Sequence, residues 1–352
     1  MRKRQASQRG FTLVELMISL TLFSFAIAGV LAVAVSMAQG YREQRQVVET
    51  EGAARGALDL VSDAVRGASP GVSDSAVVSS EVTPLSPNPH IKIGKIQDTS
   101  SSLAACPEGA FRVWNATGLG GSDELEIVYA SGGIVTTLRS TWDSTTNTSI
   151  TVPPEGAANL AAGDKLLLTD GTNGHLVAVT SVNTTSGVIG LASPQCTVTY
   201  PGTPYGMGAL VLRAMRARFY VGAFDGIASV LLMDPDSDGP LAAEPLADHV
   251  EDMQIAVGVD IDANKTIDAT EWLYSGVAGT PSSVLVPPAT PSAPLLRAVR
   301  ITLVTRSATK LAAGTATVGR PLIEDHAAGS ADTYRRRLLS TTVEIRNLGG
   351  SP

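Results

Sequence analysis

The sequence predicts an α+β fold in which one long N-terminal helix leads into a large, antiparallel β-rich head. Residues 16–41 carry no charge, and such a run is long enough for a helix to cross a hydrocarbon layer, which needs roughly 20 residues. Residues 41–66 keep a helical spacing of apolar side chains. From residue 124 onward, short alternating runs are separated by Gly, Asn, Asp and Pro. Their close spacing leaves no room for crossover helices.

Composition narrows the classes of function. The 352 residues are 44% apolar and 17% charged, with a net charge of −7, so we expect no nucleic-acid partner. The four histidines are scattered, and the sequence has neither a glycine-rich nucleotide loop nor a serine-hydrolase motif. We therefore expect that the protein is not an enzyme.

The first element is a membrane span that follows a basic leader. Arg2, Lys3, Arg4 and Arg9 precede it, which places the leader in the cytoplasm and the chain after residue 39 on the far side of the membrane. Glu15 lies inside the apolar segment, where an unpaired carboxylate is costly. Glu15 should therefore have a partner.

Residues 9–29, RGFTLVELMISLTLFSFAIAG, resemble the start of a type IV prepilin. The resemblance implies a type IV pilin-like fold, cleavage by a prepilin peptidase between Gly10 and Phe11, and methylation of the new Phe11 amine. It also implies that Glu15 faces the terminal amine of a neighbouring subunit. Physics favours the same pairing, because an amine and a carboxylate held in lipid stabilise each other. The alternative is an uncleaved signal anchor that tolerates Glu15.

The predicted organisation has four parts. They are a leader over residues 1–10, a transmembrane and assembly half of the helix over 11–40, a periplasmic half over 41–68, and a β-rich head over 69–352 that is subdivided near 200–215. The periplasmic half carries an apolar stripe that should dock on the head, formed by Ala54, Leu58, Val61 and Val65 with Ala57, Leu60 and Ala64 beside it. Gly67 and Pro70 supply the stop signal.

The head is predicted to consist of strands and turns. Residues 71–110 are expected to form a long connection with short strands such as 90–96. Further strands are expected at 124–129, 134–138, 149–152, 165–169, 176–182, 187–191, 208–212, 215–223, 228–233, 296–306 and 334–347.

The last third resembles the C-terminal half of PilW-type minor pilins. The resemblance rests on a Leu-x-x-x-Val-Glu-Asp strand at residues 246–252 that leads into an Asp-rich turn, and on two closing strands at 296–306 and 334–347. The basic run Arg335–Arg337 is expected to be a solvated strand edge or to pair with acidic neighbours. A contact with another subunit is the alternative.

Residues 260–271 are a candidate calcium site. Against the twelve-residue calcium loop, the ligands at positions one, three, five, seven, nine and twelve are Asp260, Asp262, Asn264, the carbonyl of Thr266, Asp268 and Glu271. Lys265 stands where that loop has Gly. The alternative is a hairpin turn held by Asx hydrogen bonds without a metal. Asp234–Gly239 has only the first half of the pattern and is predicted to be a plain turn.

Two cysteines, Cys106 and Cys196, fall in the exported part. An oxidising compartment permits a disulfide between them. Two buried free thiols are the alternative.

These features are interpreted as a minor pilin of a type IV pilus that contributes to assembly initiation or to the tip. Its expected partners are other pilin and minor pilin subunits, the prepilin peptidase and the inner membrane. The prepilin should lie in the bacterial inner membrane with its head in the periplasm, and later in the pilus at the cell surface. A type II secretion pseudopilin and a membrane-anchored calcium-binding adhesin are the alternatives.

Overall fold

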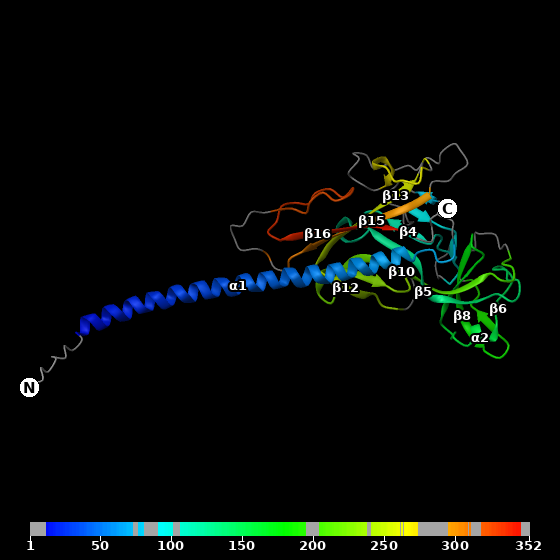
Figure 1. Ribbon diagram of the computed structural model, residues 1–352, viewed down its shortest axis with the longest axis horizontal. Helices are drawn as coiled ribbons and strands as arrows, with labels where there is room; N and C mark the ends of the chain where they lie inside the picture. The colour runs from blue at the N-terminus through cyan, green and yellow to red at the C-terminus, as the bar shows by residue number, and fades with distance from the viewer. Residues whose placement is uncertain are drawn as a thin grey trace, which may run out of the picture. The chain divides into compact units, whose positions relative to one another are not determined.

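The computed structural model describes residues 12–72, 77–80, 91–100, 106–194, 204–237, 241–260, 262, 264–273, 295–308, 310 and 318–345. The chain divides into two units, residues 1–49 and 50–352. Helix α1, Leu13–Arg66, begins in the first unit and ends in the second (Figure 1).

The first unit holds the apolar part of α1. Residues 12–38 are all exposed, and the segment Leu13–Ala38, with a mean hydropathy of 2.4, is long and apolar enough to cross a membrane. An apolar helix without protein contacts in the monomer needs either lipid or other helices around it.

In the second unit, the last turns of α1 belong to the core of the head. Ala54, Val61 and Val65 are fully buried, and Leu58 is 7% exposed, as the predicted stripe requires. Leu60, which was placed beside the stripe, is 44% exposed. The helix ends at Arg66 and the turn begins at Gly67, where Gly and Pro were expected to stop it.

The strands of the head form two sheets. Their bounds are β1 Val77–Ser80, β2 Ile91–Ile93, β3 Ile96–Asp98, β4 Phe111–Trp114, β5 Glu124–Thr137, β6 Ser149–Thr151, β7 Lys165–Thr169, β8 Gly174–Asn183, β9 Val188–Leu191, β10 Leu210–Phe224, β11 Ile227–Asp234, β12 Glu244–Asp248, β13 Val250–Asp260, β14 Trp272–Leu273, β15 Leu295–Arg306 and β16 Arg336–Glu344. Short helical segments are α2 Pro154–Ala157, η1 Leu119–Gly121 and η2 Ala269–Glu271.

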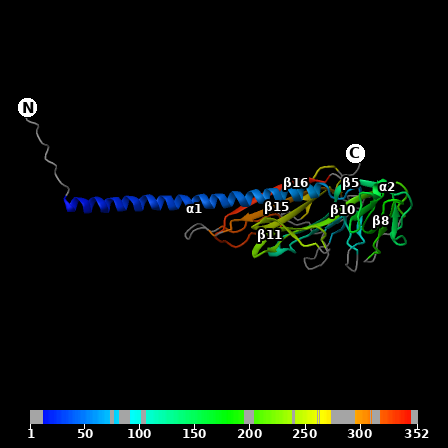
Figure 2. The same cartoon turned by 90° about the horizontal axis from the view of Figure 1, so that it is seen from below.

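The larger sheet has the order β1-β2-β4-β5-β10-β7-β8-β9-β6, with β11 on β10, β12 on β11, and β3 on β8. The smaller sheet has the order β14-β13-β15-β16. Among the described strands, β3 and β8 pair in parallel and the other pairs are antiparallel. The expected α+β fold with an antiparallel β-rich head is confirmed, and Figure 2 shows β10 and β11 beside each other within this head.

The core consists of packed clusters of apolar side chains. The main cluster joins the last turns of α1 to both sheets, through residues such as Phe111, Phe219, Ile255 and Ile301. A second cluster draws on residues between Leu138 and Val211. Strand β10 contributes to both clusters, and the subdivision near residues 200–215 stays a prediction.

Two predicted strand boundaries were wrong. Segments 124–129 and 134–138 are one strand, β5, and segments 208–212 and 215–223 are one strand, β10. The two strands pair along their length with register shifts opposite Leu212. A local irregularity that reads as a turn in the sequence is therefore absorbed as a bulge within the sheet.

Candidate functional site

The N-terminal motif begins α1 with a capping box. The backbone N–H and the hydroxyl of Thr12 donate to Oε2 of Glu15 at 3.1 and 3.0 Å, and the Glu15 N–H donates to Oγ1 of Thr12 at 3.3 Å. These bonds satisfy donors that a helix N-terminus leaves open, and the carboxylate lies favourably at the positive end of the helix dipole. Within the monomer, Thr12 binds the Glu15 carboxylate, and the expected pairing of Glu15 with the amine of a neighbouring subunit stays a prediction. Gly10 and Phe11 lie outside the described residues.

Hydroxyl groups inside the apolar segment are also satisfied within the helix. Ser19 donates to the carbonyl of Glu15, Thr21 to that of Ile18, and Ser24 to that of Leu20, each at 2.8 Å. Since lipid offers no hydrogen-bond partners, these back-bonds allow the segment to remain in hydrocarbon.

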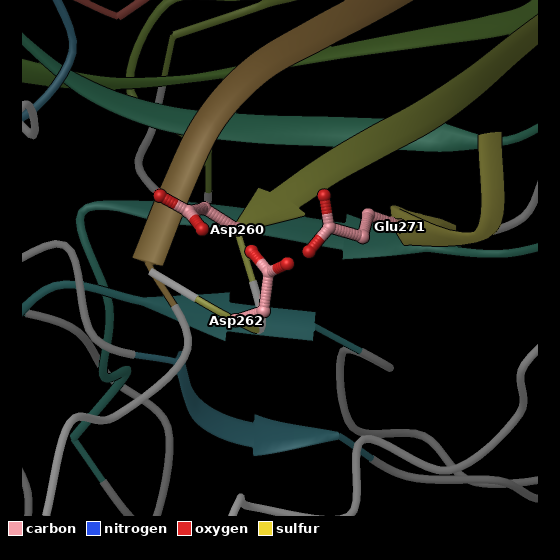
Figure 3. Close-up of side chains that lie close together, drawn as sticks. All are labelled: Asp260, Asp262 and Glu271. Atoms are coloured by element: carbon pink, nitrogen blue, oxygen red, sulfur yellow. The ribbon is translucent and has the colours of Figure 1, made fainter. Parts of the chain in front are cut away.

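The acidic loop brings three of its predicted ligands together. Asp260 ends β13, Asp262 follows in the loop, and Glu271 closes the 3₁₀ segment η2. One oxygen from each of the three carboxylates lies within 4.8 Å of the others. Figure 3 shows the three side chains converging from these elements.

Asp260 is the most enclosed member of this group. Its side chain is buried, and Oδ2 accepts from the backbone N–H of Lys265 at 3.0 Å and from Nε of Arg297, on β15, at 3.1 Å. Oδ1 is buried without a hydrogen-bond partner. A buried carboxylate oxygen is usually satisfied, so an orphan here calls for a ligand.

Lys265 adopts the backbone conformation that the calcium loop requires of its Gly. Its φ is 69°, in the left-handed region that glycine enters without steric cost. The loop therefore makes the predicted sharp turn even though Lys265 carries a Cβ.

The other predicted ligands form hydrogen bonds within the loop, and Asn264 donates from its backbone N–H and its Nδ2 to the two carboxylate oxygens of Asp262 at 3.1 and 2.9 Å. Oδ1 of Asn264 accepts from the backbone N–H and the hydroxyl of Thr266 at 2.7 and 2.6 Å. The backbone N–H of Asp268 donates to Oε2 of Glu271 at 2.9 Å. The sequence therefore located the loop, and the structure brings the carboxylates of three of its six predicted ligands together as a convergent group.

The earlier acidic turn is held by its own backbone. Oδ1 of Asp234 accepts from the N–H groups of Asp236 and Ser237 at 3.3 and 3.0 Å, as in an Asx turn. Burial is the main cause that raises the pKa of Asp234 above its ordinary value. This arrangement agrees with the prediction of a plain turn.

Comparisons with known proteins match the two ends of the chain to two different family models. Residues 218–347 match the family model of type IV pilus-assembly protein W, and residues 5–31 match the prokaryotic N-terminal methylation motif. The chain is therefore similar to PilW-type proteins over residues 218–347 and to prepilin-like proteins at its N-terminus. The PilW-type segment contains β11 to β16 and therefore the acidic loop.

Other comparisons add little. No curated protein matches the chain in sequence. A type IV-like pilin from Thermus thermophilus aligns with 12% sequence identity over 53% of this chain and 86% of its own, with a TM-score of 0.21. A TM-score this low carries no argument about the fold.

The disulfide prediction falls partly outside the described residues. Cys106 of this prepilin-like chain is buried and disulfide-bonded. Cys196 lies outside the described residues, so its pairing with Cys106 stays a prediction.

The basic run on β16 pairs with acidic neighbours. Arg336 binds Glu251 on β13 and Asp332 through charge-assisted hydrogen bonds. The same bonds lower the pKa of Asp332 to about 2 and raise that of Arg336. Arg336 therefore meets the expectation that the basic run pairs with acidic neighbours.

Sequence reasoning missed the buried charges of the head. Arg216 is fully buried and binds Asp98 on β3 and Glu126 on β5, while Arg297 reaches Asp260 from a strand 37 residues further along the chain. The sequence signal was the presence of arginines, Arg213, Arg216 and Arg218, in a strand that is otherwise apolar. It reveals that a buried partner is needed without saying which one.

Proposed function

We propose that this protein is a minor pilin of a type IV pilus, a structural subunit that contributes to assembly initiation or to the tip. The observation that supports the proposal most strongly is the methylation motif directly ahead of an exposed apolar helix. An exposed helix of this kind can be accommodated by the membrane before assembly and by the helices of neighbouring subunits after it.

The proposed pathway begins with processing. The prepilin peptidase cleaves between Gly10 and Phe11 and methylates the Phe11 amine, while the basic leader holds the N-terminus in the cytoplasm and the head in the periplasm. Cleavage places the new amine one residue before Thr12, which already holds the Glu15 carboxylate. Glu15 is therefore held at the helix end, where its carboxylate can neutralise the amine of an incoming subunit.

Docking of subunits then follows from electrostatics. A carboxylate and an amine in hydrocarbon are each costly alone, and a neighbour that brings them together removes that cost. This step favours association within the membrane. The head remains outside the helical core and offers its surfaces to other minor pilins.

The test is recovery of the protein in sheared surface filaments. Glu15→Gln keeps the size of the side chain and removes its charge, so we expect normal cleavage and loss of the protein from the filament fraction. Glu51→Gln is the matched control, because Glu51 lies on the same helix, outside the apolar segment, and pairs with Arg55 at the surface. Equal recovery of Glu15→Gln and the control in the filament fraction would refute the pairing.

Mass spectrometry of the N-terminus tests processing independently. A methylated Phe11 in the filament fraction is expected. An intact leader found only in membranes would contradict the proposal. Recovery of the protein in type IV pili would favour a minor pilin. Loss of secretion when the protein is removed would favour a type II secretion pseudopilin.

A further inference from the structure

We propose that Asp260, Asp262 and Glu271 bind one calcium ion in the head. The site is independent of the assembly role proposed above, because it lies in the second unit and uses none of the N-terminal residues. Success or failure of the calcium experiment therefore leaves the minor pilin proposal as it stands.

The spacing of the carboxylates fits calcium. Protein oxygens lie 2.3–2.6 Å from Ca²⁺, so two ligands on opposite sides of the ion are about 4.6–5.2 Å apart. The ligand oxygens of this group lie within 4.8 Å of one another. One ion can therefore contact all three side chains with little movement of the backbone.

The unpartnered oxygen of Asp260 points to a ligand independently of that spacing. Asp260 is 1% exposed, and its Oδ1 has no hydrogen-bond partner. Arg297 and the Lys265 N–H both bind Oδ2. In Figure 3 one oxygen of Asp260 is turned to Asp262 and the other to the β15 ribbon, the strand that carries Arg297. A cation beside Oδ1 would satisfy an atom that the protein leaves open.

The balance of charge leads to the same conclusion. Three carboxylates converge, and the ion pair with Arg297 supplies one positive charge to Asp260. Asp262 is exposed and Glu271 is 5% exposed, so repulsion between the carboxylates is screened by solvent on one side only. A divalent ion would remove it.

The chemistry of the donors selects calcium among the common cations. All three ligands are carboxylate oxygens, which suit hard cations, whereas zinc and copper sites use nitrogen or sulfur. Mg²⁺ requires near-octahedral ligands at 2.0–2.1 Å, and opposed oxygens would then be about 4.1 Å apart. Ca²⁺ accepts longer and less regular ligand distances, 2.3–2.6 Å, and completes its shell with water.

Binding would join parts of the smaller sheet. Asp260 ends β13, and Glu271 immediately precedes β14, the two-residue strand at the sheet edge. An ion held by both residues closes the intervening turn against β13. We therefore expect calcium to stabilise the head rather than to take part in a reaction.

The experiment uses the full chain in detergent after removal of metals by a chelator. Calorimetric titration with CaCl₂ is expected to give one site per chain with a dissociation constant on the order of 10⁻⁴–10⁻³ M, the range of extracellular calcium modules. Asp262→Asn should weaken binding at least about tenfold, since it removes one charged ligand. Asp262 is exposed, so the variant should keep the circular dichroism spectrum of the wild type.

Asp268→Asn is the matched control within the same loop. Asp268 lies outside the convergent group, and Asn can still occupy the start of η2. Its affinity should stay within about twofold of the wild type. The proposal is wrong if the wild type shows no binding up to about 10 mM CaCl₂, which is well above the expected range. It is also wrong if Asp262→Asn binds as tightly as the wild type, or if Asp268→Asn weakens binding as much as Asp262→Asn does.

Terbium offers a second readout at the same atoms. Trp272 directly follows Glu271, so Tb³⁺ bound at the site should luminesce on excitation of the indole, and CaCl₂ should displace it. Trp272→Phe should remove the luminescence and leave the calcium affinity within about twofold. Luminescence that persists in Asp262→Asn at the wild-type terbium concentration would place the ion elsewhere.

Discussion

Replacing Arg216 by Met should destabilise the head strongly. Arg216 is fully buried on β10, where Nε donates to Oδ2 of Asp98 at 3.1 Å and Nη1 donates to Oε1 of Glu126 at 2.7 Å. Both carboxylates are also buried. Met fills much of the arginine volume, so the change removes the charge without opening a large cavity.

The magnitude follows from the charges left behind. Removing one partner of a buried ion pair costs about 3–5 kcal/mol, because the remaining charge is neither hydrated nor compensated. A head of about 300 residues unfolds with an entropy near 0.6 kcal/mol/K, so the melting temperature should fall by about 5–8 °C. Arg112 still pairs with Glu126, and most of the loss should therefore arise at Asp98.

Thermal unfolding by circular dichroism measures the effect. Arg218→Met is the matched control on the same strand, because Arg218 is 38% exposed and pairs with Glu124; its cost should be about 1 kcal/mol. Adding Asp98→Asn should recover part of the stability. A melting temperature within about 1 °C of the wild type at about pH 7.5 would refute the electrostatic reasoning.

Three further predictions concern the core of the head. Burial lowers the pKa of His175 to about 4, below its ordinary value of 6.5, so its contribution to stability is complete above pH 6.5 and is lost as the pH falls to about 4. Urea unfolding should show a loss of about 3 kcal/mol over that interval, absent in His175→Gln; an equal loss in both proteins would contradict this. Val61→Ala, at a fully buried position, should cost about 2 kcal/mol, whereas Leu60→Ala, 44% exposed, should cost less than about 1 kcal/mol; similar costs would argue against docking through the stripe. Cys106→Ser should cost about 2–5 kcal/mol, and peptide mapping without reductant should find Cys106 linked to Cys196; two alkylated thiols would exclude the bridge.

Local sequence signals were sufficient for the long helix and for the position of the acidic loop. The helical period of the apolar residues predicts the buried face of α1 at Val61 and Val65. The adjacent Gly and Pro predict its end at Arg66. The acidic loop was found because its oxygen-bearing residues recur at fixed short offsets. In each case the interacting residues are neighbours in the chain, so the pattern itself carries the geometry.

The remaining features depend on contacts between distant segments. β5 and β10 are single strands because they pair with each other through bulges, which overrides local turn signals. The pairing of Arg297 with Asp260 and the enclosure of Arg216 by Asp98 and Glu126 join residues far apart in sequence. The sequence by itself determined the long apolar helix, the N-terminal methylation motif and the position of the acidic loop. Only the tertiary structure decided which carboxylates converge and which arginines they meet, because burial and long-range strand pairing set those distances.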